Sequence, residues 1–173
     1  IDVLSRIANE FGHFAQMPPA HPANLDLVEV ANTAVHLFAN TPGCTIHLIA
    51  NEELPVFADR EHLLRAFNNL IKNAQQAIPE EREGHVQVLL YRQDVDSTTR
   101  QGWAIAEISD NGTGIPNDAL DHVFVPKFST KSSGMGLGLP MVKRMVENAN
   151  GRVWFDTKEG HGTSFFVALP LKT

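Results

Sequence analysis

Short apolar runs of strand length alternate with longer helical segments along most of this chain, and this alternation limits the fold more than any other feature. The expected strands are residues 25–27, 45–50, 56–58, 85–93, 103–109, 152–157 and 163–171, and the expected helices are 28–40, 59–78 and 137–150. Several helices beside a mostly antiparallel sheet indicate an α/β (α+β) two-layer sandwich. The length of 173 residues suits one domain with one core.

The segment 59–78 has the clearest helical pattern, with Asp59 as a suitable N-cap and Pro79 just past the end. Asn69 and Asn73 are four residues apart and therefore project from one side of this helix. Asparagine is a mediocre helix former, and its carboxamide oxygen suits Mg²⁺. The alternative is a solvated polar face. The expected buried stripe consists of Leu63, Phe67, Leu70, Ala74 and Ala77.

Composition and charge exclude several classes of protein. The net charge of −6 argues against a nucleic-acid surface, and 43% apolar with 20% charged residues is typical of a soluble globular chain. No apolar run in the sequence is long enough to span a bilayer, and we expect no signal peptide within it. The single Cys44 excludes an internal disulfide and fits a reducing compartment. Because the first residue is Ile, we expect a part of a longer protein.

Two glycine-containing stretches do not serve as simple turns. "DNGTGIP" (110–116) follows an expected strand, but Pro116 and Asn117 then start a helical turn, so no hairpin strand returns. In "GMGLGL", Gly134, Gly136 and Gly138 expose backbone N–H groups beside a helix start, which favours anion binding. No P-loop motif and no protein-kinase H-R-D or D-F-G set occurs, and the glycines follow a loop, unlike a dinucleotide fingerprint.

The N-terminal segment is different from the body. Ile1, Leu4, Ala8, Phe11 and Ala15 alternate spacings of three and four, as in a helix packed on a partner helix, although a docked surface helix would give the same pattern. "PPAHP" (18–22) then ends the helix and forms a stiff linker.

Five stretches together carry a family resemblance. In order, "NNLIKNAQQA", "DNGTGIP", "VFVPKFSTK", "GMGLGL" and "GHGTSF" resemble the N, G1, F, G2 and G3 boxes of the GHKL ATPase superfamily, over residues 59–170. The sequences of these boxes are similar to those of sensor histidine kinases of the nitrogen-regulatory (NtrY/NtrB-like) type. The stretch "FGHFAQMP" resembles the end of that family's dimerisation helix. The resemblance implies the Bergerat ATP-binding fold, a mixed sheet covered by three helices, with a mobile ATP lid at 117–135. It also implies two parts: 1–22, the end of the dimerisation helix plus linker, and 23–173, the catalytic domain.

The same resemblance implies the site residues. Asp110 would accept a hydrogen bond from the adenine amine, Gly112 and Gly114 would let the base approach, and Thr163 would complete the adenine site. Asn73 would bind Mg²⁺, and the residues implied as catalytic are Asn69, Asn73 and Lys131. Lys127 and Lys131 would neutralise phosphate charge from the lid, unless they are ordinary solvated lysines. The full ATP-binding set is Asn69, Asn73, Asp110, Gly112, Gly114, Ile115, Lys127, Lys131, Gly134, Met135, Gly136, Leu137, Gly138 and Thr163.

Other positions that match the family boxes are expected to act indirectly. Phe124 and Phe128 match the F box and should anchor the lid by packing against the body. His122 and His161 should lie near the nucleotide, without a role that the resemblance assigns.

One departure from the family pattern bears on the reaction. Hydrolysing members carry a glutamate general base four residues before the metal-binding asparagine, where this chain has Asn69, and an amide is no base at neutral pH. The resemblance therefore implies transfer of the ATP γ-phosphoryl group to a histidine. The alternatives are a GHKL ATPase, an anti-sigma-type kinase or a non-catalytic nucleotide-binding domain.

The implied partners follow from the same comparison of motifs. None of the eight histidines lies in the family's phosphoacceptor motif, so the acceptor is expected on a dimerisation domain of the same protein. The further implied partners are ATP and a cognate response regulator, with no nucleic acid. The parent would be a homodimer, a bacterial sensor anchored in the inner membrane whose catalytic domain is cytoplasmic.

Overall fold

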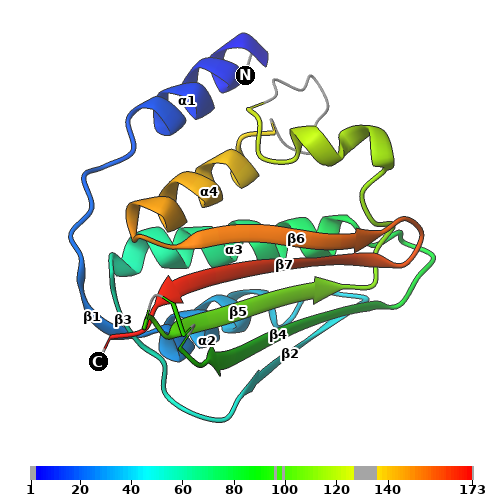
Figure 1. The fold of residues 1–173 in the computed structure, drawn as a ribbon. Helices are drawn as coiled ribbons and strands as arrows, with labels where there is room; N and C mark the ends of the chain where they lie inside the picture. The colour runs from blue at the N-terminus through cyan, green and yellow to red at the C-terminus, as the bar shows by residue number, and fades with distance from the viewer. Residues whose placement is uncertain (1–2, 96, 99, 127–135, 173) are drawn as a thin grey trace.

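A five-stranded sheet forms the centre of the molecule (Figure 1). A computed structural model describes residues 3–95, 97–98, 100–126 and 136–172. The strand order is β2 (Cys44–Ala50), β4 (Gly84–Gln93), β5 (Trp103–Asp110), β7 (Gly162–Pro170) and β6 (Arg152–Lys158). The β2–β4 pair is parallel and the other three pairs are antiparallel. A separate antiparallel pair joins β1 (Ala23–Asp26) to β3 (Pro55–Ala58).

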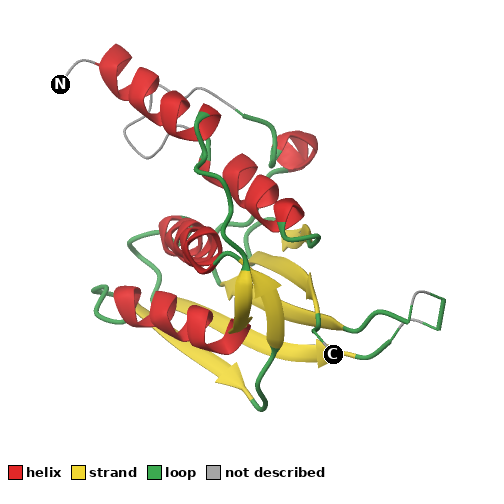
Figure 2. Cartoon of the chain, turned by 90° about the vertical axis from the view of Figure 1, so that its left-hand side faces the viewer, coloured by secondary structure: helices red, strands yellow, loops and turns green. Residues whose placement is uncertain are grey.

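Three helices lie on one face of this sheet, and no helix among the described residues covers its other face (Figures 1 and 2). They are α2 (Leu27–Phe38), α3 (Arg60–Gln76) and α4 (Gly138–Asn148), and α1 (Val3–Ala15) precedes them in the chain. The expected two-layer sandwich with a mixed, mostly antiparallel sheet is therefore confirmed. No helix within the described residues is both long and apolar enough to cross a membrane.

The core lies between the helices and the sheet. Along β4, Val86, Val88 and Leu90 are buried against the helices, while Gln87 and Tyr91 point to the open face. Helix α3 supplies most of the expected apolar face: Leu63, Phe67, Leu70 and Ala74 are buried, whereas Ala77 is the half-buried C-cap. Its buried residues are His62, Leu63, Ala66, Phe67, Leu70, Ile71 and Ala74.

Element boundaries differ slightly from those expected. Leu27 was assigned to a strand but begins α2, because the Asp26 carboxylate accepts a hydrogen bond from the backbone N–H of Val28 at 3.0 Å. The same Asp26 oxygen accepts the N–H of Leu54 at 2.8 Å, which ties α2 to the segment before β3. A side-chain cap therefore overrides the apolar pattern at this position.

The segment expected to form the ATP lid is described only in its first part. Pro116 precedes a 3₁₀ helix, η1 (Asn117–His122), which confirms the expected helical turn. The Phe124 ring lies 6.0 Å from that of Phe155 and 6.2 Å from that of Phe165, so Phe124 packs against the body as expected. Residues 127–135, including Phe128, lie outside the described part of the chain.

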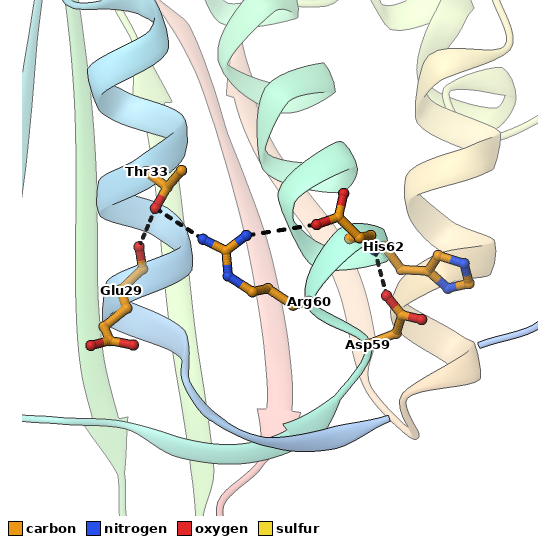
Figure 3. A network of polar contacts seen from close by, with 6 residues as sticks. Glu29, Thr33, Asp59, Arg60 and His62 are labelled. Carbon is orange, nitrogen blue, oxygen red and sulfur yellow. Dashed lines mark hydrogen bonds and ion pairs between the residues drawn. The ribbon is translucent and has the colours of Figure 1, made fainter. Parts of the chain in front are cut away.

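Asp59 connects the linker to the start of α3. Its two carboxylate oxygens accept backbone hydrogen bonds, one from His62 in the first turn of α3 at 3.0 Å and one from His21 in the linker at 2.6 Å. Figure 3 shows the helix cap and the neighbouring Arg60, which reaches Thr33 of α2. Partial burial alone would raise the pKa of Asp59. The backbone hydrogen bonds from His21 and His62 nevertheless hold its pKa below the ordinary value.

Replacing Asp59 with Ala should lower the free energy of unfolding by about 0.5–2 kcal/mol at neutral pH, the usual cost of losing an N-cap. Because the pKa of Asp59 is lower in the folded state, the carboxylate stabilises the fold fully above its ordinary pKa of about 3.9. That contribution is lost as the pH falls through the lowered folded pKa. Urea unfolding of wild type and Asp59→Ala, at neutral pH and at a pH below the lowered folded pKa, measures the difference in unfolding free energy. The variant Asp94→Ala, at an exposed aspartate, is the control. An unchanged difference at low pH would contradict this assignment.

Candidate active site

A solvent-open cavity of about 450 Å³ lies between α3, the end of β5, η1 and the start of α4. This volume is within the range of small-molecule sites. Its polar lining includes residues from four separate elements of the chain. The lining residues are Asn73, Gln76, Ala77, Asp110, Gly114, Ile115, Ala119, His122, Val123, Val125, Gly136, Leu139, Thr163 and Phe165.

The turn after β5 forms one wall and admits only glycine at two positions. A Cβ on Gly112 would lie 2.5 Å from the carbonyl oxygen of Ala77, and one on Gly114 would lie 2.5 Å from that of Lys158. Gly114 also has φ +72°, which disfavours other residues. The backbone of this turn is therefore packed directly against α3 and the β6–β7 turn. This contact explains why glycines occupy the turn that follows the strand.

Asp110 is the last residue of β5 and points into the cavity lining. Burial raises the pKa of Asp110 above its usual value, and hydrogen bonds from the backbone N–H groups of Gly112 and Thr163 oppose that rise. The Gly112 N–H lies 2.8 Å from Asp110 Oδ1. A carboxylate held in this way presents acceptor oxygens to a ligand with N–H groups.

Two threonines of β6 and β7 lie beside this turn and Asp110. Thr163 in β7 is buried, and its hydroxyl lies 2.8 Å from that of Thr157 in β6. The Thr157 hydroxyl accepts the N–H of Ile115 at 2.9 Å and donates to the Gly162 carbonyl at 3.1 Å. This network joins the expected site residues Thr163 and Ile115, which are distant in sequence.

The asparagines of α3 occupy different positions at the other end of the cavity. Asn73 lines the cavity, while Asn69 lies against the start of α4, where a Cβ on Gly138 would meet Asn69 Oδ1 at 3.3 Å. Both asparagines project from the same side of α3, as their spacing predicted. Only Asn73 is therefore placed to bind a ligand in the cavity directly.

The start of α4 provides backbone donors. Gly136 lines the cavity with φ +67°, and Leu137 is the N-cap residue without a side-chain hydrogen bond to the helix. A helix start without a side-chain cap leaves N–H groups available to an anion. The expected phosphate-binding residues Lys127, Lys131, Gly134 and Met135 lie outside the described residues.

Several lining residues were missed by the sequence reasoning. Gln76 follows Asn73 by three positions, and Phe165 follows Thr163 by two, so helix and strand periodicity could have found both. Gly162, which does not line the cavity, was also missed as a close backbone contact: it has φ +127°, and a Cβ placed on it would lie 2.0 Å from the Asp110 carbonyl oxygen. His122 lines the cavity as expected, while His161 lies exposed in the β6–β7 turn and is not a lining residue.

The donor set of the cavity fits Mg²⁺ brought by phosphate groups. The carboxamide of Asn73 offers a hard, neutral oxygen, and Mg²⁺ usually keeps several waters and few protein ligands. Among the described residues, no group of three His, Cys, Asp or Glu side chains could hold a metal ion. A magnesium site here would therefore depend on ligands supplied by the nucleotide.

The fold and the cavity define a two-layer sandwich with a ligand site at one end of the sheet. Residues 58–173 match the family model described as Histidine kinase-, DNA gyrase B-, and HSP90-like ATPase, and the chain belongs to this family. ATP is accordingly the ligand of the domain.

Comparisons with individual proteins point to sensor kinases within this family. The chain is 36% identical over 131 residues to "Sensor histidine kinase DcuS" of Escherichia coli (strain K12), covering 74% of this chain and 23% of that protein. It is 37% identical over 123 residues to "Sensory histidine kinase/phosphatase NtrB" of Rhizobium meliloti (strain 1021), covering 67% and 32%. The structure of "Mycobacterial sensor histidine kinase MprB" superposes with a TM-score of 0.72 and 28% identity, over 89% of this chain and 99% of that one. The chain thus spans only about a quarter to a third of the two curated relatives.

Proposed function

We propose that this chain is the ATP-binding catalytic domain of a sensor histidine kinase, which transfers the ATP γ-phosphoryl group to a histidine of the same protein. The observation that carries this proposal is the cavity in which Asp110, Thr163 and Asn73 meet, in a chain of the ATPase family. The similarity to named sensor histidine kinases supports the choice of acceptor.

The adenine end of the site is the Asp110 end. Asp110 accepts the exocyclic amine of adenine, and Thr163 completes the polar contact. Gly112 and Gly114 keep side chains out of this space, and Ile115 supplies an apolar surface for the base. Guanine carries a carbonyl in place of that amine and would meet the Asp110 carboxylate with a second acceptor.

The phosphate end is formed by α3 and the start of α4. Gly136, Leu137 and Gly138 offer backbone N–H groups to the phosphates. We propose that Gly134 and Met135 also bind the phosphates. Asn73 holds Mg²⁺, which when bound offsets negative charge on the phosphates. Lys127 and Lys131 add positive charge from the lid segment, and Lys131 and Asn69 assist the transfer.

The identity of residue 69 favours transfer over hydrolysis. Asn69 stands where hydrolysing relatives carry a glutamate, and its amide lies against Gly138. An amide takes no proton from water at neutral pH, so a nucleophile that needs no such base is favoured. A neutral histidine imidazole is such an acceptor.

The proposed function also involves a dimerisation domain and a response regulator outside the catalytic domain. Residues 1–22 are proposed as the end of a dimerisation helix with its linker, and 23–173 as the catalytic domain. The acceptor histidine belongs to that dimerisation domain, and a response regulator receives the phosphoryl group from it. The parent protein is proposed to be a homodimeric sensor anchored in the bacterial inner membrane, with this domain in the cytoplasm and no nucleic-acid partner.

With γ-labelled ATP, this chain alone should bind nucleotide but gain no label, and it should release phosphate slowly. Addition of a fragment carrying the parent's dimerisation helices should place acid-labile label on that fragment, because phosphohistidine is acid-labile. The acceptor fragment with its histidine changed to Gln is the matched control. Stable label on this chain alone, or rapid phosphate release without the acceptor, would contradict the proposed reaction.

A further inference from the structure

Arg82, in the loop between α3 and β4, reaches the backbone of the turn that follows β5. Its Nη1 donates to the carbonyl oxygen of Asn111 at 2.5 Å and to that of Gly112 at 2.8 Å. The carbonyl of Gly160 in the β6–β7 turn lies 3.5 Å from the same nitrogen. One guanidinium thus contacts carbonyl groups of two turns, the one after β5 and the one between β6 and β7.

The peptide between Asn111 and Gly112 links Arg82 to Asp110. The chain contains no cis peptide bond among its described residues, so the C=O and N–H of this peptide point in opposite directions. The C=O accepts from Arg82, and the N–H donates to Asp110 Oδ1 at 2.8 Å. The guanidinium and the carboxylate therefore lie on the two sides of one peptide group.

This peptide needs a constraint because one of its residues is glycine. Glycine populates positive and negative φ about equally, so a peptide next to it rotates at little steric cost. A rotated peptide would turn its carbonyl oxygen toward the Asp110 carboxylate, replacing a donor with a second acceptor. The charged hydrogen bonds from Arg82 favour the orientation in which the N–H meets Asp110.

Other hydrogen bonds hold the neighbouring parts of the turn, whereas the carbonyl of the Asn111–Gly112 peptide accepts from Arg82. The Asn111 side chain accepts the N–H of His85 at 2.8 Å and donates to the carbonyl of Glu83 at 2.9 Å. The Thr113 N–H donates to the Ala77 carbonyl at 2.9 Å. These bonds hold residues 111 and 113, while the contacts to the Asn111 and Gly112 carbonyls come from Arg82.

We propose that Arg82 is a positioning residue for nucleotide selection, which holds the Asn111–Gly112 peptide so that its N–H orients the carboxylate of Asp110 toward the adenine amine. This inference rests on the proposed function, in which Asp110 reads adenine. Arg82 is not among the residues that line the cavity, so we expect it to act on the nucleotide only through Asp110. Its effect should therefore depend on the group at position 6 of the purine.

The test compares ATP with purine riboside triphosphate, which lacks the 6-amino group, by calorimetry in the presence of Mg²⁺. Wild type should prefer ATP, and Arg82→Ala should bind ATP roughly tenfold more weakly, in keeping with hydrogen bonds to a charged partner. Affinity for the analogue should change little, so the preference for ATP should fall toward that of Asp110→Ala. Arg82→Lys should be intermediate, because an ammonium lacks the planar fork of a guanidinium.

Matched variants separate positioning from general stability. Arg92→Ala removes an exposed arginine whose ion pair with Glu52 lies on the far part of β4, and it should keep the wild-type preference. In an Asp110→Ala background, Arg82→Ala should cost little further ATP affinity, because coupled residues are not additive. If Arg82→Ala does not fold, Arg82→Lys and Arg82→Gln must still lose part of the preference.

Two results would overturn this inference and leave the role of Asp110 intact. Equal weakening for ATP and the analogue, with the preference retained, would show that Arg82 only supports the fold. An unchanged ATP affinity in a folded Arg82→Ala protein would show that the peptide needs no such contact. A wild-type protein without preference for ATP would instead remove the role given to Asp110, and this inference with it.

Discussion

Asn73→Ala should lower the rate of phosphoryl transfer roughly 100-fold or more while weakening ATP binding far less. Removal of one preorganised group that stabilises transition-state charge usually costs on the order of 10²–10³ in kcat. Asn73 is one of two α3 carboxamides that line the cavity, with Gln76, and it is the one proposed to hold Mg²⁺. Since metal placement matters most where charge is redistributed, the loss should fall on transfer more than on binding.

Single-turnover transfer to the acceptor fragment and calorimetric ATP binding measure the two effects separately. Asn32→Ala is the matched control, because Asn32 is an exposed asparagine on α2 away from the cavity. Equal losses in ATP binding and in transfer would mean that Asn73 stabilises the bound ATP complex but gives no additional stabilisation to the transition state. A fully active Asn73→Ala protein would remove it from the proposed site.

Asp110→Ala should weaken ATP binding by about 1–3 kcal/mol, or roughly 5- to 150-fold, the cost of losing a hydrogen bond to a buried or charged partner. The carboxylate must be ionised to act only as an acceptor, and burial raises the pKa of Asp110. ATP binding by wild type should therefore weaken as the pH falls through that raised pKa. This pH effect should begin at a higher pH than for an ordinary aspartate.

Calorimetry with ATP and GTP over a range of pH tests this role of Asp110. Asp110→Ala should bind ATP without the pH dependence that Asp110 contributes, and titration of the phosphates is common to both proteins. Asp156→Ala, which changes an exposed aspartate of β6, should behave as wild type. Equal affinity of the wild type for GTP and ATP would rule out adenine selection by this carboxylate.

The parts of the site that depend on local chemistry could be predicted from the sequence. Gly112 and Gly114 are required by close backbone contacts within a turn, and Asp110 ends the strand that leads into it. Helical spacing predicts that Asn69 and Asn73 share one side of α3, and the family resemblance then implies the role of Asn73, which lines the cavity. The order of strands and helices was predictable for the same reason, because each element shows its own periodicity.

The parts that depend on tertiary contacts could not be predicted from the sequence. Arg82 lies 29 and 30 residues from the carbonyl groups that it contacts, and nothing in its own loop indicates that direction. The Thr157 hydroxyl joins Ile115 across 42 residues. Leu27 shows the same limit at short range, since the cap provided by Asp26 outweighs its apolar pattern.

Asp59 connects the linker to the first turn of α3, which bears on how the domain could move. His21 and the first turn of α3 share one carboxylate, and Asn73 lies farther along the same helix. The 17 residues of α3 extend about 26 Å at 1.5 Å per residue, so linker and phosphate end are joined by one stiff rod. In the proposed assembly, a swing of the domain toward its acceptor would therefore pivot before His21. In such a rotation the bound nucleotide and the domain would move together as one rigid body.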